Sequence, residues 1–171
     1  VLKMDSYDVD FSPNDKFLFV EKGGEVEKYN LWYHSLSQTI KFPDNPDDIK
    51  ISPDGKFLAL GGNKTVIFNL ETNVEVMQFA GTSNLAYSPD GKLLATQPGK
   101  VYNLETGATV HEFIGGNSVA FSPDGEYLAI GGERKEESYN RSTRTYVYTD
   151  PITIYSLKTG RKFSSISADQ T

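Results

Sequence analysis

The same short motif occurs four times along the chain. The four copies are VDFSPNDKFLFV, IKISPDGKFLAL, LAYSPDGKLLAT and VAFSPDGEYLAI, and their serines are Ser12, Ser52, Ser88 and Ser122, at spacings of 40, 36 and 34 residues. A second motif follows each copy: LSQT from Leu36, LETN from Leu70, LETG from Leu104 and LKTG from Leu157. Two motifs that recur in a fixed order identify a repeat protein. Such a chain folds as similar units that pack against their neighbours.

Each unit is predicted to form four short antiparallel strands. In the last unit, Ser118 to Phe121 leads into a Ser-Pro-Asp-Gly turn, in which Pro123 presets φ and Gly125 takes the left-handed conformation. The turn that contains the second motif then joins a third strand to a fourth. The expected second strands are 17–20, 57–60, 93–96 and 126–130. The expected third strands are 31–35, 65–69, 101–103 and 152–156, and the fourth are 39–42, 74–79, 109–113 and 161–166.

This pattern predicts an all-β fold, a β-propeller of four blades with four antiparallel strands in each. A four-stranded sheet in a unit of about 40 residues has the period of a propeller blade. Sheets stacked in a propeller bury both faces, and Val66 and Phe68 point to one face while Ile67 points to the other. No stretch keeps the 3.6-residue apolar period of a helix. The expected blades are 5–42, 47–79, 83–113 and 117–166, the last with an insertion at 133–150.

The pattern V-x-F-S-P-D-G-x-x-L-A, followed by an aromatic third strand and a turn like LETG, resembles the WD-repeat propeller family. The resemblance spans most of the chain and implies a ring of seven or eight blades. The Trp-Asp pair that names the family is replaced, and the aligned pairs are His34-Ser35, Phe68-Asn69, Tyr102-Asn103 and Tyr155-Ser156. The hydrogen-bond network that the family builds on this pair therefore cannot form. TolB-like and YVTN-type propellers share the Ser-Pro-Asp-Gly turn and are alternatives.

Apolar residues are expected on the outer faces of the first and last units. The first unit has Phe17, Phe19 and Trp32, and residues 1–4 align with the fourth strand of a preceding unit. If such a face exposes roughly 500 Å² of apolar surface, its burial contributes about 12 kcal/mol. We therefore expect an arc of a larger ring. The remaining blades would come from the same longer chain or from a second copy, and a closed ring of four blades is the third alternative.

Composition and charge exclude several classes of protein. The chain has no cysteine, which excludes disulfides, thiolate zinc sites and cysteine nucleophiles. Its formal net charge of −6 is opposite to the basic surface of a nucleic-acid-binding protein. The longest apolar runs have four or five residues, too few for a helix that spans a bilayer. Since no signal peptide is visible, we expect an intracellular protein, cytoplasmic or nuclear.

The sequence predicts no catalytic residue, no cofactor and no metal site. It contains neither a Gly-x-Ser-x-Gly elbow nor a phosphate-binding loop. His34 and His111, the two histidines, are expected in a third and a fourth strand as packing or surface residues. The acidic stretch 43–48 carries oxygen ligands that suit a hard cation. It lacks the alternating spacing of a calcium loop, so we interpret it as a turn between blades.

One segment, from Glu133 to Asp150, departs from the repeat. The second motif follows Ser122 by 35 residues, against 18 after Ser52, and the extra 17 residues fall between the second and third strands. Residues 145–149 alternate as a strand does, which predicts a protruding hairpin on the rim that carries the interblade connections. Tyr and Arg are enriched at interface hot spots. The predicted partner-binding residues are Arg134, Tyr139, Arg141, Arg144, Tyr146 and Tyr148.

These observations favour a non-enzymatic scaffold for protein–protein interaction, which presents a propeller rim to partner proteins. The acidic chain is expected to bind basic or neutral partners. The alternative is a TolB-like or YVTN-like propeller domain that serves a hydrolase or a cell-envelope complex. Both hypotheses rest on family analogy, because a fold does not determine a function.

Overall fold

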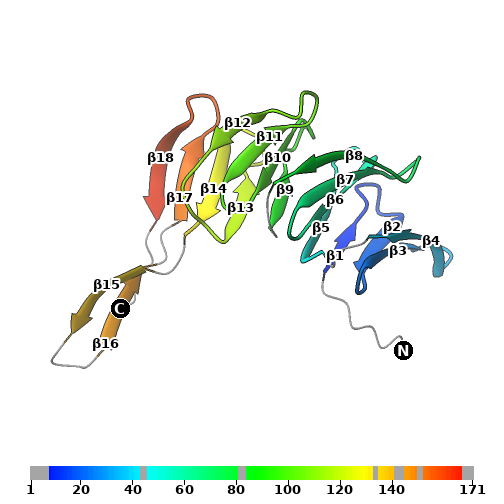
Figure 1. The fold of residues 1–171 in the computed structure, drawn as a ribbon, viewed down its shortest axis with the longest axis horizontal. Coiled ribbons are helices and arrows are strands. Elements are labelled where there is room, and N and C mark those ends of the chain that lie inside the picture. The colour runs from blue at the N-terminus through cyan, green and yellow to red at the C-terminus, as the bar shows by residue number, and fades with distance from the viewer. Residues whose placement is uncertain are drawn as a thin grey trace.

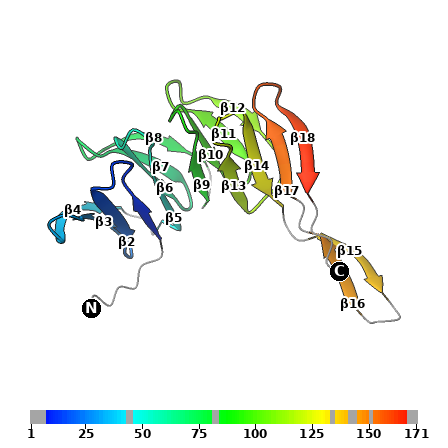
Figure 2. The same ribbon diagram turned by 180° about the vertical axis from the view of Figure 1, so that it is seen from behind.

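The computed structural model describes residues 8–42, 46–80, 84–132, 135–140, 145–149 and 152–166, with the side chains of 135–140 and 145–149 left out. The described residues form strands and turns, without a helix. Among them, therefore, no helix has the length and apolar character needed to cross a membrane. Four antiparallel sheets of four strands each account for most of the chain, which confirms the predicted fold class. Figures 1 and 2 show the sheets standing one after another along an arc, in chain order.

The four sheets, called blades 1 to 4, each keep the order of their strands in the sequence. Blade 1 contains β1 (Val9–Phe11), β2 (Phe17–Glu21), β3 (Glu25–Asn30) and β4 (Ser35–Lys41). Blade 2 contains β5 (Asp48–Ile51), β6 (Phe57–Gly61), β7 (Thr65–Asn69) and β8 (Val74–Phe79). Blade 3 contains β9 (Leu85–Tyr87), β10 (Leu93–Thr96), β11 (Lys100–Asn103) and β12 (Thr109–Glu112). Blade 4 contains β13 (Ser118–Phe121), β14 (Tyr127–Gly131), β17 (Ile152–Ser156) and β18 (Arg161–Ile166).

The inner strands β1, β5, β9 and β13 contact one another in succession, so they form the concave side of the arc. The outer strands β4, β8, β12 and β18 lie at the far edge of each blade. In every blade the register between the third and fourth strands shifts once, at a β-bulge. The residues skipped at the four bulges are Ser37, Val76, Val110 and Phe163.

The predicted third strand of the first unit is wrong, and the fourth, expected at 39–42, begins earlier, at Ser35. The structure places β3 at Glu25–Asn30 and a turn over 31–34, where a strand was expected. Leu31 N–H donates to the Lys16 carbonyl (2.9 Å), as Leu70 N–H does to Lys56 (2.8 Å). Leu31, rather than Leu36, is therefore the residue equivalent to Leu70. The letters LSQT resemble LETN, but these residues belong to the outer strand.

The correction also moves the pair of residues that aligns with Trp-Asp. In blade 1 this pair is Tyr29-Asn30, at the end of β3, instead of His34-Ser35. Every blade then has an aromatic residue followed by Asn or Ser at this position. The equivalent pairs in blades 2 to 4 are Phe68-Asn69, Tyr102-Asn103 and Tyr155-Ser156, as predicted.

The hydrophobic core is divided among the three interfaces between neighbouring blades. Between blades 2 and 3, Ala59 and Ile67 pack against Leu85 and Leu94, all at most 2% exposed. Aromatic rings pair across each interface, from the residue at or just after the fourth strand of one blade to the third strand of the next. The pairs are Phe42–Phe68 at 6.0 Å, Phe79–Tyr102 at 4.1 Å and Phe113–Tyr155 at 4.2 Å between ring centroids. The aromatic at the Trp position therefore joins one blade to the previous one.

Candidate interaction surface

Two sets of turns lie at one edge of the arc, which we call the turn rim. One set joins the first and second strands, and the other joins the third and fourth. Because β1 and β3 run in the same direction, the turns that follow them emerge at the same edge of the sheet. Interblade connections and the turns between second and third strands lie at the opposite edge.

The Ser-Pro-Asp-Gly turns are held by a repeated set of hydrogen bonds. In blade 3, Ser88 Oγ donates to Asp90 Oδ1 (2.7 Å) and accepts the Leu93 N–H (2.9 Å). Asp90 Oδ1 also accepts the Lys92 N–H (3.1 Å). These hydrogen bonds to Asp90, of which the one from Ser88 has the largest effect, hold the pKa of Asp90 below its ordinary value. The same contacts recur in blades 2 and 4, so these aspartates are structural.

Successive turns of this set contact one another. A Cβ placed on Gly55 would lie 3.6 Å from Pro13 Cδ, and the same holds for Gly91 and Pro53. Gly125 and Pro89 have the same relation, at 3.7 Å. The proline of one blade thus covers the glycine of the next, and the motif joins blades as well as strands.

In blades 1 to 3 the turn of the second set is held by an asparagine, Asn30, Asn69 or Asn103. Asn69 Oδ1 accepts the N–H groups of Glu71 and Thr72, both at 2.9 Å. Asn30 does the same for Trp32 (3.0 Å) and Tyr33 (2.9 Å). Such Asx turns fix the backbone through a local side chain. The last residue of each turn has positive φ: His34 at 49°, Asn73 at 57°, Gly107 at 72° and Gly160 at 66°.

Trp32 and Tyr33 occupy the tip of the blade 1 turn and point to solvent. Their side chains are exposed by 85% and 74%, respectively. The expected place of Trp32 in a third strand, on the apolar outer face of the first unit, is therefore wrong. The equivalent residues of the other turns are Glu71-Thr72, Glu105-Thr106 and Lys158-Thr159. Blade 1 alone thus carries an aromatic pair on a backbone frame that all four blades share.

The two histidines lie apart and have different surroundings. His34 is exposed at the left-handed turn position, which corrects its expected place in a strand. His111 lies in β12, half-buried, and its ring stacks on Phe113 with 5.3 Å between centroids. Across the ranges that the structure describes, no group of three His, Cys, Asp or Glu residues could hold a metal ion.

Carboxylates on the concave side bind the backbone of the next inner strand. Asp8 Oδ2 accepts the Ile49 N–H (2.8 Å), and Asp10 Oδ2 accepts the Ile51 N–H (2.7 Å). Lys50 Nζ lies 2.8 Å from Asp48 Oδ1 and 3.5 Å from Asp8 Oδ2.

Two opposed effects act on the charged groups of this cluster. Burial, and then the hydrogen bond with Asp8, raise the pKa of Asp48. Burial lowers the pKa of Lys50, whereas its hydrogen bond to Asp48 and the nearby carboxylates raise it. The raising effects together outweigh burial, so the pKa of Lys50 lies above its ordinary value. Asp8, Asp10 and Asp48 are thus engaged in contacts between neighbouring blades.

The inner strands of blades 2 to 4 also line a shallow hollow of about 720 Å³ on the concave side. Its lining is mostly apolar, and Lys50 is its charged residue. Ala86 and Ala120 stand where blade 2 has Lys50, so small side chains replace a charged one along this surface.

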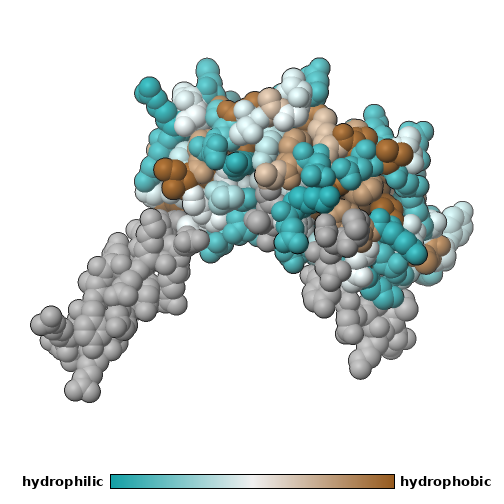
Figure 3. Space-filling model, viewed as in Figure 1, coloured by the Kyte–Doolittle hydropathy of each residue, from teal (hydrophilic) through white to brown (hydrophobic). Residues whose placement is uncertain are grey.

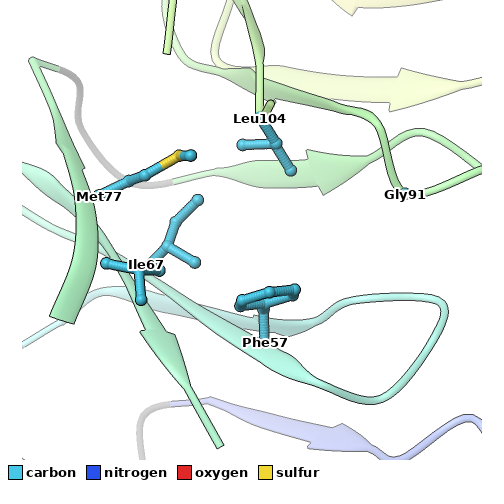
Figure 4. A pocket seen from close by; sticks show the side chains of 6 residues that line it. Phe57, Ile67, Met77, Gly91 and Leu104 are labelled. Atoms are coloured by element: carbon cyan, nitrogen blue, oxygen red, sulfur yellow. The ribbon is translucent and has the colours of Figure 1, made fainter. Parts of the chain in front are cut away.

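A small apolar groove opens at the interface between blades 2 and 3 (Figure 4). Its volume is about 290 Å³, and blade 2 supplies most of its walls. Leu104 and Gly91 close it from the two turns of blade 3. The lining residues are Phe57, Ile67, Val76, Met77, Gly91 and Leu104. The close-up shows Leu104 reaching from the turn of blade 3 toward Ile67 and Phe57.

The insertion forms a two-stranded sheet, β15 (Lys135–Asn140) with β16 (Thr145–Thr149), which projects away from blade 4 in Figure 1. Its register pairs Tyr139 with Tyr146 and Tyr148 with Glu136. A hairpin is thus present, as predicted. Of the six predicted binding residues, Arg134, Arg141 and Arg144 lie outside the described residues. The side chains of Tyr139, Tyr146 and Tyr148 lie outside the described part as well.

Comparison with known proteins supports the same architecture. A family model described as "WD domain, G-beta repeat" matches residues 107–135. No curated protein matches the sequence. Hydrazine synthase of Kuenenia stuttgartiensis superimposes with a TM-score of 0.75 and 18% identity, over 97% of this chain and 51% of that chain. The WD40 repeats of RRP9 superimpose with a TM-score of 0.66 and 14% identity, over 98% of this chain and 64% of that chain.

This chain therefore spans about half the length of the hydrazine synthase chain and less than two thirds of the RRP9 chain. At these identities the likeness concerns the fold. The repeated turns, the four sheets and these comparisons agree. The chain has the fold of a WD-repeat-like β-propeller, in which the four blades form an arc that does not close.

Proposed function

We propose that this protein is a non-enzymatic scaffold that binds partner proteins through the turn rim, with Trp32 and Tyr33 as the central contacts. The observation that carries the proposal is their exposure, 85% and 74%, on a turn whose backbone is fixed by Asn30. WD-repeat-like propellers are typical of protein–protein interaction scaffolds. The likeness to an enzyme chain, hydrazine synthase, concerns the fold and brings no chemistry to this chain.

The chemistry of the turn supports a protein partner. Trp and Tyr are the residue types most enriched at interface hot spots, where they fill pockets of the other protein. A rigid turn loses little conformational entropy when it binds, which favours affinity. The other three turns carry Glu-Thr or Lys-Thr at this place, so the same frame without the aromatic pair is already present in the molecule.

The proposal can be tested with peptides selected from a phage-displayed library against the whole chain. The double variant Trp32→Glu, Tyr33→Thr converts the tip of the blade 1 turn to that of blade 2, so folding should be unchanged. We expect this variant to lose binding of the selected peptides by about tenfold or more, in line with a hot spot of 1–3 kcal/mol. The matched control is Glu71→Ala, Thr72→Ala in blade 2. Equal binding by the two variants would contradict the proposal.

We further propose the hairpin of the insertion as a second contact, through Arg134, Tyr139, Arg141, Arg144, Tyr146 and Tyr148. Its support is the composition of the segment and the projection of the β15–β16 backbone from blade 4. Deletion of residues 134–149 should leave peptides of the turn rim bound and remove any that select the hairpin. Unchanged binding of every selected peptide would contradict this second contact. An accessory role beside a hydrolase or a cell-envelope complex stays a prediction from the shared turn motif.

A further inference from the structure

The apolar groove between blades 2 and 3 has its walls within the chain. It lies away from the open face of blade 4, which has no following blade. Ile67 is 2% exposed and Val76 is 46% exposed, so the groove runs from the core of the interface to the surface. Over blades 2 and 3, Figure 3 shows hydrophobic residues beside hydrophilic ones. The groove is therefore an accessible apolar site with a polar border.

The equivalent place between blades 1 and 2 is occupied by a lysine. Lys28 stands in β3 where Ile67 stands in β7, because both pair with the middle residue of the second strand. Lys28 Nζ lies 4.1 Å from the centre of the Phe17 ring. Phe17 is the counterpart of Phe57, so in blade 1 a cation lies over the aromatic ring that the groove leaves uncovered.

The outer wall of the groove is also specific to blade 2. Val76 and Met77, at and just after the β-bulge, form this wall. Blade 1 has Ser37 and Gln38 at these two positions. The apolar wall is therefore not required for a blade to fold or for the bulge to form.

Between blades 3 and 4 a histidine takes the position of Met77. His111 pairs with the third strand at the same step of the sheet. Its ring stacks on Phe113, and a Cβ placed on Gly160 would lie 3.3 Å from His111 Nδ1. The imidazole thus reaches the turn of blade 4. Blades 2 and 3 form the interface at which these wall positions are all apolar.

The border of the groove is acidic. Lys56 and Lys92 are each matched by the aspartate of their own turn, with distances of 3.9 Å from Nζ to Oδ2 of Asp54 and Asp90. Exposed glutamates add further negative charge. The exposed charged residues of this part of blades 2 and 3 are Asp54, Lys56, Glu71, Glu75, Asp90, Lys92 and Glu105. Five carboxylates and two ammonium groups give the border a formal charge of −3.

This acidic border is not a property of the repeat. Lys158 stands in blade 4 where Glu71 stands in blade 2, at the tip of the second turn. Lys162 likewise stands where Glu75 does, since each pairs with the aromatic residue of the third strand. The same backbone thus carries positive charge in blade 4 and negative charge beside the groove.

We propose that the groove binds a linear basic peptide, one leucine of which enters the groove while lysines or arginines on both sides of it lie over the acidic border. The volume of about 290 Å³ suits a single side chain, because sites for small molecules occupy roughly 300–1,000 Å³. The flexible thioether of Met77 can adapt to the entering side chain. Complementary charge then selects basic peptides over others. The site belongs to other blades than Trp32 and Tyr33, so it is a further contact beyond the proposed function.

Titration of the whole chain with a synthetic peptide, followed by methyl NMR, tests the proposal. The probe is Gly-Lys-Lys-Leu-Lys-Lys-Gly with both ends blocked. It should shift the methyl signals of Ile67, Met77 and Leu104, which line the groove. A probe with serine in place of leucine should bind about tenfold more weakly or worse, because the apolar burial is lost. A probe with glutamates in place of the lysines should also bind at least about tenfold more weakly at low salt.

Variants of the chain locate the site. Val76→Ser, Met77→Gln gives the groove the outer wall of blade 1, so the fold should be kept while binding falls about tenfold or more. Val110→Ser, at the bulge of blade 3 and 43% exposed, is the matched control and should bind as the wild type does. Glu71→Lys, Glu75→Lys gives the border the charges of blade 4 and should weaken the basic probe. Far-UV circular dichroism checks that the sheets are retained.

Several results would overturn the proposal. Equal binding of the leucine and serine probes would show attraction by charge alone, and equal binding of the lysine and glutamate probes would contradict a basic partner. Hexanol that produced the same shifts as tightly as the probe would indicate a small apolar ligand instead. No binding, or equal binding by the groove variant and its control, would overturn the site.

The turn variant separates this site from the proposed function. Trp32→Glu, Tyr33→Thr should lose the peptides selected on the turn rim and bind the leucine probe as the wild type does. Loss of the probe in this variant would place the basic peptide on the blade 1 turn and overturn the groove. Failure of the probe, together with selected peptides that need Trp32, would leave the scaffold proposal standing.

Discussion

The interface between blades 2 and 3 and the open face of blade 4 are built from matching residues in different surroundings. Ile67 in β7 and Ile154 in β17 pair with Ala59 and Ala129, respectively, at the same place in their sheets. Ile67 is 2% exposed, whereas Ile154 is partly exposed. The repeat therefore specifies the apolar pattern of a blade face, and the next blade supplies its burial. An exposed face of this kind has the composition of a core.

The largest expected difference between the two regions is the effect of removing the isoleucine. Ile67→Ala should destabilise the chain by about 2–5 kcal/mol, because it leaves a cavity in a closed interface. Ile154→Ala should cost only about 1 kcal/mol, since water already reaches that site. Urea denaturation measures both. Equal costs would mean that the face of blade 4 is covered in the single chain, contrary to the structure.

A smaller difference is expected at the serines of the first set of turns. Ser88→Ala deprives the Leu93 N–H and the Asp90 carboxylate of a partner at a site that is 2% exposed, so we expect a loss of about 1–3 kcal/mol. Ser122→Ala should cost about 0.5–1 kcal/mol, because solvent at the more open blade 4 turn can replace the hydroxyl. The free energies of unfolding in urea decide the order. A larger loss at Ser122 would contradict this account.

Glycines in the same turns should show no difference between the two regions. Gly91 and Gly125 have φ values of +71° and +73°, and a Cβ at either place would make only ordinary contacts, at 3.6 and 3.7 Å. Gly91→Ala and Gly125→Ala should therefore each cost about 1 kcal/mol, from backbone strain. Asp15, with φ of 57°, holds the matching place in blade 1. Asp15→Gly should stabilise the chain by a few tenths of a kcal/mol, less than the strain of alanine, because aspartate tolerates the left-handed conformation better. Thermal unfolding measures the three shifts, and a stabilising Gly91→Ala would refute the strain argument.

The smallest expected effect concerns pH. Hydrogen bonds from Ser88 and Ser122 lower the pKa of Asp90 and Asp124 below the ordinary value of 3.8. A carboxyl with a lowered folded-state pKa stabilises the fold above its unfolded pKa, and this contribution is lost as the pH falls through the folded pKa. Asp90→Asn and Asp124→Asn should therefore each flatten the acid loss of stability slightly, and by similar amounts, because both turns are exposed. Urea midpoints measured from neutral pH down to about pH 3 test this. A steeper acid loss in either variant would contradict it.

Much of the fold follows from local sequence signals. The Ser-Pro-Asp-Gly turns are specified by local sequence, because the serine and aspartate bind nearby backbone N–H groups and the glycine adopts the positive φ that the turn needs. The all-β arrangement of four strands in each unit is confirmed for the same reason. The hairpin of the insertion also follows from the alternation of residues 145–149.

The errors arise where similar letters have different physical roles. The third strand of blade 1 was misplaced because LSQT resembles LETN. The residue that fixes each turn is instead an asparagine, Asn30 in blade 1 and Asn69 in blade 2. An asparagine followed by leucine at the end of an aromatic strand was the better signal. Trp32 was assigned to a blade face for the same reason, and the candidate site of the turn rim was missed with it. The contact of each proline with the next glycine depends on how blades stack, which no local pattern specifies.

The β-bulge in every outer strand has a consequence for solubility. An outer strand presents unpaired backbone groups along the edge of its sheet, and a flat edge of this kind can pair with another protein and start aggregation. The skipped residues Val76, Val110 and Phe163 are apolar and are 46%, 43% and 65% exposed, which would add to that hazard. A bulge kinks the strand and interrupts its ladder of donors and acceptors. Each blade therefore carries, at the same register, a built-in obstacle to the growth of its sheet into a fibril.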